Sequence, residues 1–111
     1  MKYEPLGSVS VAEVEDRFTS GDPHVITETL ISAALHVSDN VRVEQWVVQF
    51  ADHSDPGIRR AAALAVGHLV RIHGRVGDAA VAAVEALADD AALSGAAQDA
   101  LEDVEIFTRP K

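Results

Sequence analysis

The sequence has no cysteine, and it is poor in aromatic residues, in basic residues and in long hydrophobic runs. Without cysteine it can form neither a disulfide nor a thiolate metal site, and a reducing compartment suits such a chain. No stretch approaches the roughly 20 apolar residues that a membrane-spanning helix needs. Glu4 and Pro5 stand where a signal peptide would have its apolar run. We therefore expect a cytoplasmic protein without a membrane contact.

Basic residues are scarce: 9 stand against 18 acidic residues, so the formal net charge is −9. Nucleic-acid binding depends on basic side chains that meet phosphates, so this balance argues against a nucleic-acid partner. A basic protein partner would suit it, although acidity also serves solubility alone. The segment 78–105 contains no lysine or arginine, and its acidic residues are Asp78, Glu85, Asp89, Asp90, Asp99, Glu102, Asp103 and Glu105. One end of the molecule is thus expected to hold most of the negative charge.

A chain of 111 residues with 48% hydrophobic content can form one domain with its own core. We expect a single all-α domain over 1–111, with tails at 1–7 and 108–111, because helix signals dominate and no strand signal appears. The expected helices are 9–19, 23–37, a third capped by Ser38 or Asp39, a fourth from Pro56 to a stop at Gly74, a fifth capped by Asp78, and 93–106.

Apolar residues at three-four spacing predict the buried face of each helix. From the second helix to the sixth these stripes are Ile26, Leu30, Ala33, Ala34; Val43, Trp46, Val47, Phe50; Ile58, Ala61, Ala62, Ala65, Val66, Leu69, Ile72; Val81, Val84, Leu87, Ala88; and Ala97, Ala100, Leu101, Val104. Trp46 is the only tryptophan. It either fills the core or acts as a binding anchor, since tryptophan is enriched at interface hot spots.

A repeat organises the chain. Asp22-Pro23 recurs as Asp55-Pro56, and Asp90 follows at a nearly equal interval. Each interval holds two helices and two turns, which predicts a short α-solenoid of about three helix pairs. The alternative is an irregular helical bundle in which the repeated Asp-Pro pair is a coincidence.

One stretch reads Asp55-Pro56-Gly57-Ile58-Arg59-Arg60-Ala61-Ala62-Ala63-Leu64-Ala65-Val66-Gly67. It resembles the second-helix signature of HEAT-like repeats, including the short bacterial kind named after phycobilisome lyases. The resemblance implies that Arg59 bonds to the inter-repeat turn that Asp55 and Pro56 set. The first copy has Thr27 in the place of Arg59 and a polar Thr29 in its stripe, so we expect it to be a degenerate or capping repeat.

Two further segments read Gly67-His68-Leu69-Val70-Arg71-Ile72-His73-Gly74 and Asp99-Ala100-Leu101-Glu102-Asp103-Val104-Glu105-Ile106-Phe107. They look like a group of short bacterial HEAT-like proteins, over roughly 41–107. Members of that group are regarded as immunity proteins for secreted polymorphic toxins. This resemblance implies a protein-binding function.

Patterns for catalysis or cofactor binding are absent from the sequence. His68 and His73 miss the spacing that places two zinc ligands on one helix face. The acidic pairs at 89–90 and 102–103 are interpreted as solvated helix surface, because no phosphate loop or nucleophile elbow accompanies them. We expect neither an enzyme, nor a cofactor, nor a metal site.

The favoured hypothesis is an immunity protein that neutralises a cognate toxin, a basic protein domain, through an acidic helical surface. The candidate partner-binding residues are Asp89, Asp90, Asp99, Glu102, Asp103 and Trp46. Asp99, Glu102 and Asp103 are expected on one exposed face, with no basic residue near them in sequence. The alternatives are a HEAT-repeat scaffold or adaptor without inhibitory role, and a lyase-type enzyme subunit, which no motif supports.

Overall fold

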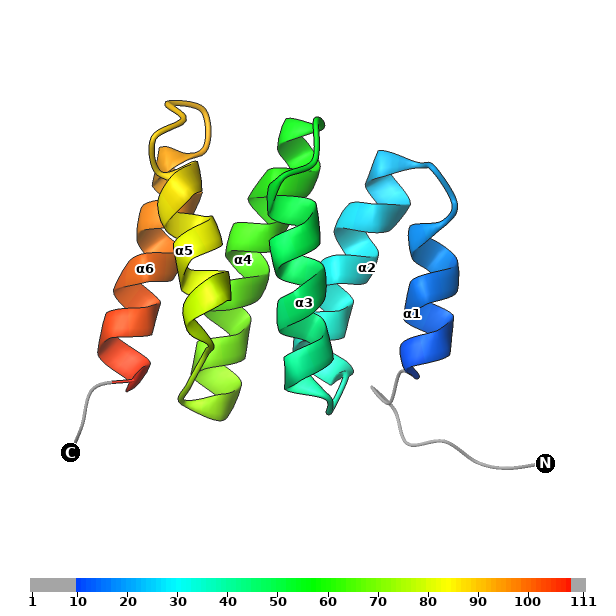
Figure 1. Ribbon diagram of the computed structural model, residues 1–111, viewed down its shortest axis with the longest axis horizontal. Coiled ribbons are helices and arrows are strands. Elements are labelled where there is room, and N and C mark those ends of the chain that lie inside the picture. The colour runs from blue at the N-terminus through cyan, green and yellow to red at the C-terminus, as the bar shows by residue number, and fades with distance from the viewer. Residues whose placement is uncertain (1–9, 109–111) are drawn as a thin grey trace.

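The structure, a computed structural model, describes residues 10–108, and over that range it is all-helical (Figure 1). Its helices are α1 (Val11–Phe18), α2 (Pro23–His36), α3 (Asn40–Ala51), α4 (Pro56–His73), α5 (Asp78–Leu87) and α6 (Ser94–Thr108). The tails expected at 1–7 and 109–111 lie outside the described residues, whereas Thr108, which was assigned to a tail, is the last residue of α6. No helix within 10–108 is long and apolar enough to cross a membrane.

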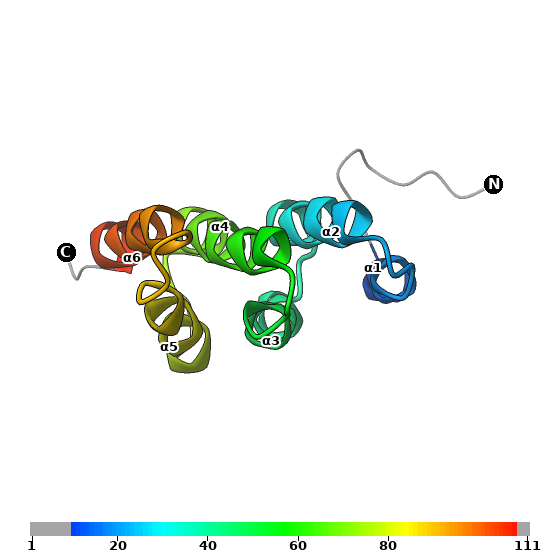
Figure 2. The same ribbon diagram turned by 90° about the horizontal axis from the view of Figure 1, so that it is seen from above.

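The helices form two layers (Figure 2). One layer contains α2, α4 and α6 side by side, and the other contains α1, α3 and α5. Consecutive helices run in opposite directions, so α2, α4 and α6 are parallel to one another (Figure 1). The central helix α4 packs against α2, α3, α5 and α6. Every other described helix is therefore positioned, directly or through one neighbour, by α4.

Aspartate side chains cap three of the six described helices. Asp22 accepts a hydrogen bond from the His24 amide at 2.9 Å, and Asp39 accepts one from the Arg42 amide at 3.1 Å. Asp55 accepts two, from Gly57 and Ile58. These bonds satisfy amide groups that a helix leaves without an internal partner at its first turn. Pro23 and Pro56 follow two of the caps, as their fixed backbone angle and missing amide hydrogen allow.

The fifth helix begins differently from the prediction. Asp78 is its first residue, and the N-cap is Gly77, which offers no side chain. The Glu44 carboxylate on α3 accepts a hydrogen bond from the Gly77 amide at 2.7 Å. The cap expected at Asp78 is therefore wrong, because a carboxylate from another helix occupies this turn. Gly74, the predicted stop, does end α4, with a positive φ of 69° that suits glycine.

The core lies between the two layers, and α4 contributes most to it. Its alanine-rich inner face is fully buried together with Ile58, Val66 and Leu69. Small side chains there let the neighbouring helices approach closely. The prediction fails for Ile72, which is half-exposed because it lies one turn beyond His68 on the outer side of α4. Four other predicted core residues are only partly buried, at the end of the layers where the described residues supply no further helix pair: Val81, Ala88, Leu101 and Val104.

Candidate functional site

The five acidic residues predicted to bind a partner lie in three separate places. Asp89 and Asp90 belong to the connection between α5 and α6. Asp99 and Asp103 line a groove between α4 and α6, whereas Glu102 lies beside Gln98, Leu101 and Glu105 on another side of α6. Consecutive residues of a helix point about 100° apart. Asp103 therefore faces the groove, whereas Glu102, its neighbour in sequence, points outside it. The predicted three-carboxylate face is thus divided.

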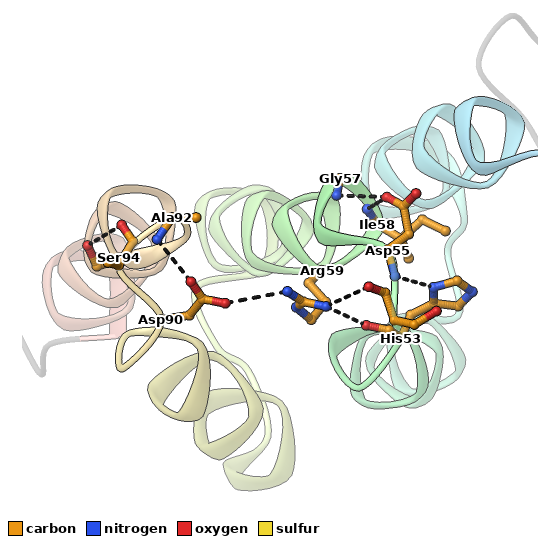
Figure 3. Close-up of polar contacts among 10 residues, drawn as sticks. His53, Asp55, Gly57, Ile58, Arg59, Asp90, Ala92 and Ser94 are labelled. Carbon is orange, nitrogen blue, oxygen red and sulfur yellow. Dashed lines mark hydrogen bonds and ion pairs between the residues drawn. The ribbon is translucent and has the colours of Figure 1, made fainter.

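Arg59 connects two turns of the structure (Figure 3). Its guanidinium donates to the carbonyl oxygens of His53 at 2.9 Å and Ser54 at 3.0 Å, within the turn between α3 and α4. It also meets the Asp90 carboxylate at 3.4 Å, in the connection between α5 and α6. This geometry matches the structural role that the HEAT-like resemblance implies for Arg59.

Both carboxylate oxygens of Asp90 have partners within this structural network. Oδ2 faces Arg59, and Oδ1 accepts a hydrogen bond from the Ala92 amide at 2.9 Å, which shapes the approach to α6 (Figure 3). Asp89, its neighbour, is exposed. Both residues were predicted to contact a partner. Among residues 10–108, the Asp90 carboxylate has partners within the chain and the Asp89 carboxylate has none.

The groove between α4 and α6 has a floor of small residues and charged sides. Its volume is about 130 Å³, and it is lined by Ala63, Leu64, Gly67, His68, Arg71, Ala96, Asp99, Ala100 and Asp103. Arg71 donates to the Asp103 carboxylate at 2.7 Å, and Asp103 is only 16% exposed. No basic residue lies near these carboxylates in sequence, but in the fold α4 brings Arg71 beside Asp103 from a distant part of the chain.

Gly67 and His68 complete the environment of this ion pair. A methyl group at Gly67 would lie 3.1 Å from Oδ2 of Asp103, so the glycine leaves room for the carboxylate. The pKa of His68 is lowered from its ordinary value by burial and, to a smaller extent, by the positive charge of Arg71, while Asp103 acts in the opposite direction. The neutral form of His68 is thereby favoured.

Trp46 is an interior residue, with 4% of its surface exposed. Its ring packs edge-on against Phe18 at 5.3 Å, and Phe18 also contacts Phe50 at 4.6 Å. These rings join α1 to α3 and cover the tryptophan. This burial favours the core-filling interpretation of Trp46, since a buried side chain presents little surface to a partner, and its role as a binding anchor stays a prediction.

Sequence reasoning missed an apolar edge on the layer of α2, α4 and α6. Four large hydrophobic side chains are about half-exposed there: Leu35, Ile72, Ile106 and Phe107. All belong to the C-terminal turns of the three helices, which end at the same edge because the helices are parallel (Figure 1). The sequence did contain a signal of this exposure. Leu35 and Phe107 are large hydrophobic residues that lie outside the apolar stripes of their helices.

A second apolar groove lies in the other layer, between α3 and α5. It has a volume of about 330 Å³ and is lined by Val41, Glu44, Gln45, Val48, Ala79 and Ala80. Within residues 10–108 no group of three or more histidine, aspartate or glutamate side chains is arranged to hold a metal ion.

No protein-family model matches the chain, and a search of curated proteins also gave no match. Among solved structures, the chain is similar to one in the crystal structure of a CDI complex from Cupriavidus taiwanensis. The two share 30% sequence identity and a TM-score of 0.74, over 96% of this chain and 97% of the other. Similarity of sequence and fold over nearly both whole chains places this protein in the same family as that component of the CDI complex.

Proposed function

We propose that this protein is an immunity protein, which binds a cognate toxin and neutralises it. The observation that supports the proposal is the similarity, over nearly its whole length, to a chain of a CDI complex. CDI denotes contact-dependent inhibition, a system of paired toxin and immunity proteins. Of these two roles, the small helical architecture and the net charge of −9 favour the immunity role, because an acidic surface suits the capture of a basic toxin domain.

The architecture proposed for this role is a short α-solenoid of about three HEAT-like helix pairs. The repeated Asp-Pro helix starts and the two helical layers support it. So does Arg59, which links consecutive turns. Such a scaffold presents a broad helical surface to a partner. We place its action in the cytoplasm and assign it no catalytic step.

Co-expression with a toxin tests this function. The probe is the C-terminal domain of the protein encoded immediately upstream of this gene, produced in a bacterial host with and without this chain. The expected result is growth arrest by the domain alone, restored growth when the chain is present, and a stable complex on size-exclusion chromatography.

The control is the same experiment with a non-cognate toxin domain, which the chain should leave active. A soluble, folded chain that neither binds the upstream domain nor restores growth would refute the immunity function. A scaffold or adaptor without inhibitory role would then be the better hypothesis.

A further inference from the structure

The groove between α4 and α6 unites a narrow apolar floor, an excess of negative charge and an apolar border. We propose that it receives a single lysine or arginine side chain of the partner protein, and that this contact is a main anchor of the complex. This inference rests on the proposed function, and it names the part of the surface and the chemistry of the partner residue.

The shape of the groove fits one extended side chain. The residues of its floor carry at most a methyl group: Ala63, Gly67, Ala96 and Ala100. A volume of about 130 Å³ is too small for a helix or a loop but suits the aliphatic stem of a long basic side chain. Such stems pack on apolar surface while the charged end reaches a polar group.

The charges of the groove select a cation. Two carboxylates, from Asp99 and Asp103, face one guanidinium, from Arg71. Arg71 already pairs with Asp103, at 2.7 Å. Asp99 is exposed and has no ion-pair partner among residues 10–108. A cationic side chain that entered the groove would restore the balance of charge at Asp99.

The border of the groove favours protein over a small cation. Ile72 follows Arg71 on α4, and Ile106 and Phe107 end α6, all about half-exposed. The ends of the two helices are adjacent, since a methyl group at Gly74 would lie 3.7 Å from the Phe107 carbonyl oxygen. Apolar residues around a charged contact exclude water and strengthen it. The matching partner surface therefore carries a basic residue flanked by apolar side chains.

The first test compares Asp99→Asn with Glu102→Gln, using the purified upstream toxin domain as the probe. Both residues are exposed, both belong to α6 and both variants remove one negative charge, but only Asp99 lines the groove. The expected result for Asp99→Asn is a loss of affinity of about tenfold or more, mainly in the dissociation rate and persisting at high salt. Glu102→Gln should cost about threefold at most, in the association rate, and only at low salt.

The outcomes distinguish the groove from the general charge of the protein. Equal effects of the two variants would overturn the groove anchor while leaving the immunity function intact. A wild-type chain that fails to bind the domain would refute the proposed function itself, and with it this inference. Circular dichroism and melting temperature verify that both variants are folded.

A second test alters the space in the groove without changing its charge. Gly67→Ala places a methyl group on the floor, 3.1 Å from the Asp103 carboxylate, whereas Gly95→Ala places one where no atom lies within 4 Å. Both substitutions favour the helix. Gly67→Ala should reduce affinity about fivefold or more, and Gly95→Ala should leave it unchanged. Equal affinity of the two variants would show that the groove is not occupied in the complex.

Discussion

The turn between α3 and α4 and the groove between α4 and α6 use the same kinds of side chain in opposite ways. At the turn, the guanidinium of Arg59 is shared among two carbonyl oxygens and the Asp90 carboxylate, and Asp55 is occupied by two helix amides. In the groove, Arg71 meets one carboxylate and Asp99 meets none of the described basic residues. These polar groups of the turn are all paired within the chain, whereas the groove leaves Asp99 without an ion-pair partner among the described residues.

This difference separates the conspicuous motif from the candidate site. The Asp-Pro-Arg pattern dominates the sequence, yet its polar groups are satisfied within the protein and stabilise it. Asp99 and Asp103 stand out in the sequence by their charge, but the groove that they share with Arg71 arises only when α4 and α6 pack side by side. Substitutions at the turn should therefore act mainly on stability, and substitutions at the groove mainly on binding to the partner.

The largest expected loss of stability concerns Trp46, which belongs to the closed interior. Trp46→Ala should lower the free energy of unfolding by about 3–5 kcal/mol, because it leaves a cavity beneath Phe18. Urea denaturation followed by circular dichroism measures this. The control is Leu35→Ala, at a half-exposed position, which should change it by about 0.5 kcal/mol or less. A stable Trp46→Ala variant that no longer binds would instead assign the tryptophan to the interface.

Arg59→Ala should be the next most damaging. It should lower the free energy of unfolding by about 1–3 kcal/mol, since the two turn carbonyls lose their charged donor. The matched control is Arg60→Ala, because Arg60 is exposed and has no ion pair among residues 10–108. Affinity for the partner, measured well below the melting temperature, should stay at the wild-type value in both variants. An Arg59→Ala variant with normal stability and lost affinity would make Arg59 a contact residue. The turn could then no longer be assigned a purely structural role.

Arg71→Met should affect the groove more than the fold. Its ion pair with Asp103 is half-exposed on the arginine side, so stability should fall by about 1 kcal/mol or less. The groove would then hold two carboxylates and no guanidinium. Association with a basic partner should become about twofold to fivefold faster at low salt, as stopped-flow kinetics can measure. Slower association would indicate that Arg71 itself contacts the partner.

The smallest effect concerns pH. Because the folded-state pKa of His68 is lowered, the unfolded chain binds the proton more readily, and stability falls as the pH drops through about 6.5. His68→Gln removes this contribution, so its melting temperature should fall less than that of the wild type between about pH 7.5 and about pH 5.5. The difference should be small, since His68 keeps contact with solvent. Identical pH dependence of the two proteins would contradict the lowered pKa.

The features that could be predicted from the sequence are local ones. The helical class, the caps at Asp22 and Asp55 and the stop at Gly74 each depend on a few neighbouring residues. For the third helix the sequence left Ser38 and Asp39 open, and the structure has Asp39 as the cap. The cap at Asp78 failed because Glu44, from a different helix, occupies the turn. Local patterns carry no information about such a contact.

The candidate site was predictable only in part. Asp99 and Asp103 were identified from their charge, but Arg71 was not, because it lies on another helix and meets Asp103 only in the folded chain. The position of Glu102 outside the groove depends on the rotation of α6 against α4, which three-four spacing does not fix. The exposed Ile72 was assigned to the core because its spacing continues the stripe of α4.

The parallel direction of α2, α4 and α6 has an electrostatic consequence of its own (Figure 1). Peptide dipoles align along a helix and leave a partial negative charge at its C-terminal end, and in parallel neighbours these ends add rather than cancel. The apolar edge is therefore also the negative end of the layer formed by α2, α4 and α6. The other layer has the opposite sign at this edge, because α1, α3 and α5 place their positive N-terminal ends there. A cationic group approaching this edge is drawn toward one layer by the main chain itself. That preference persists through any side-chain substitution that keeps the helices in place.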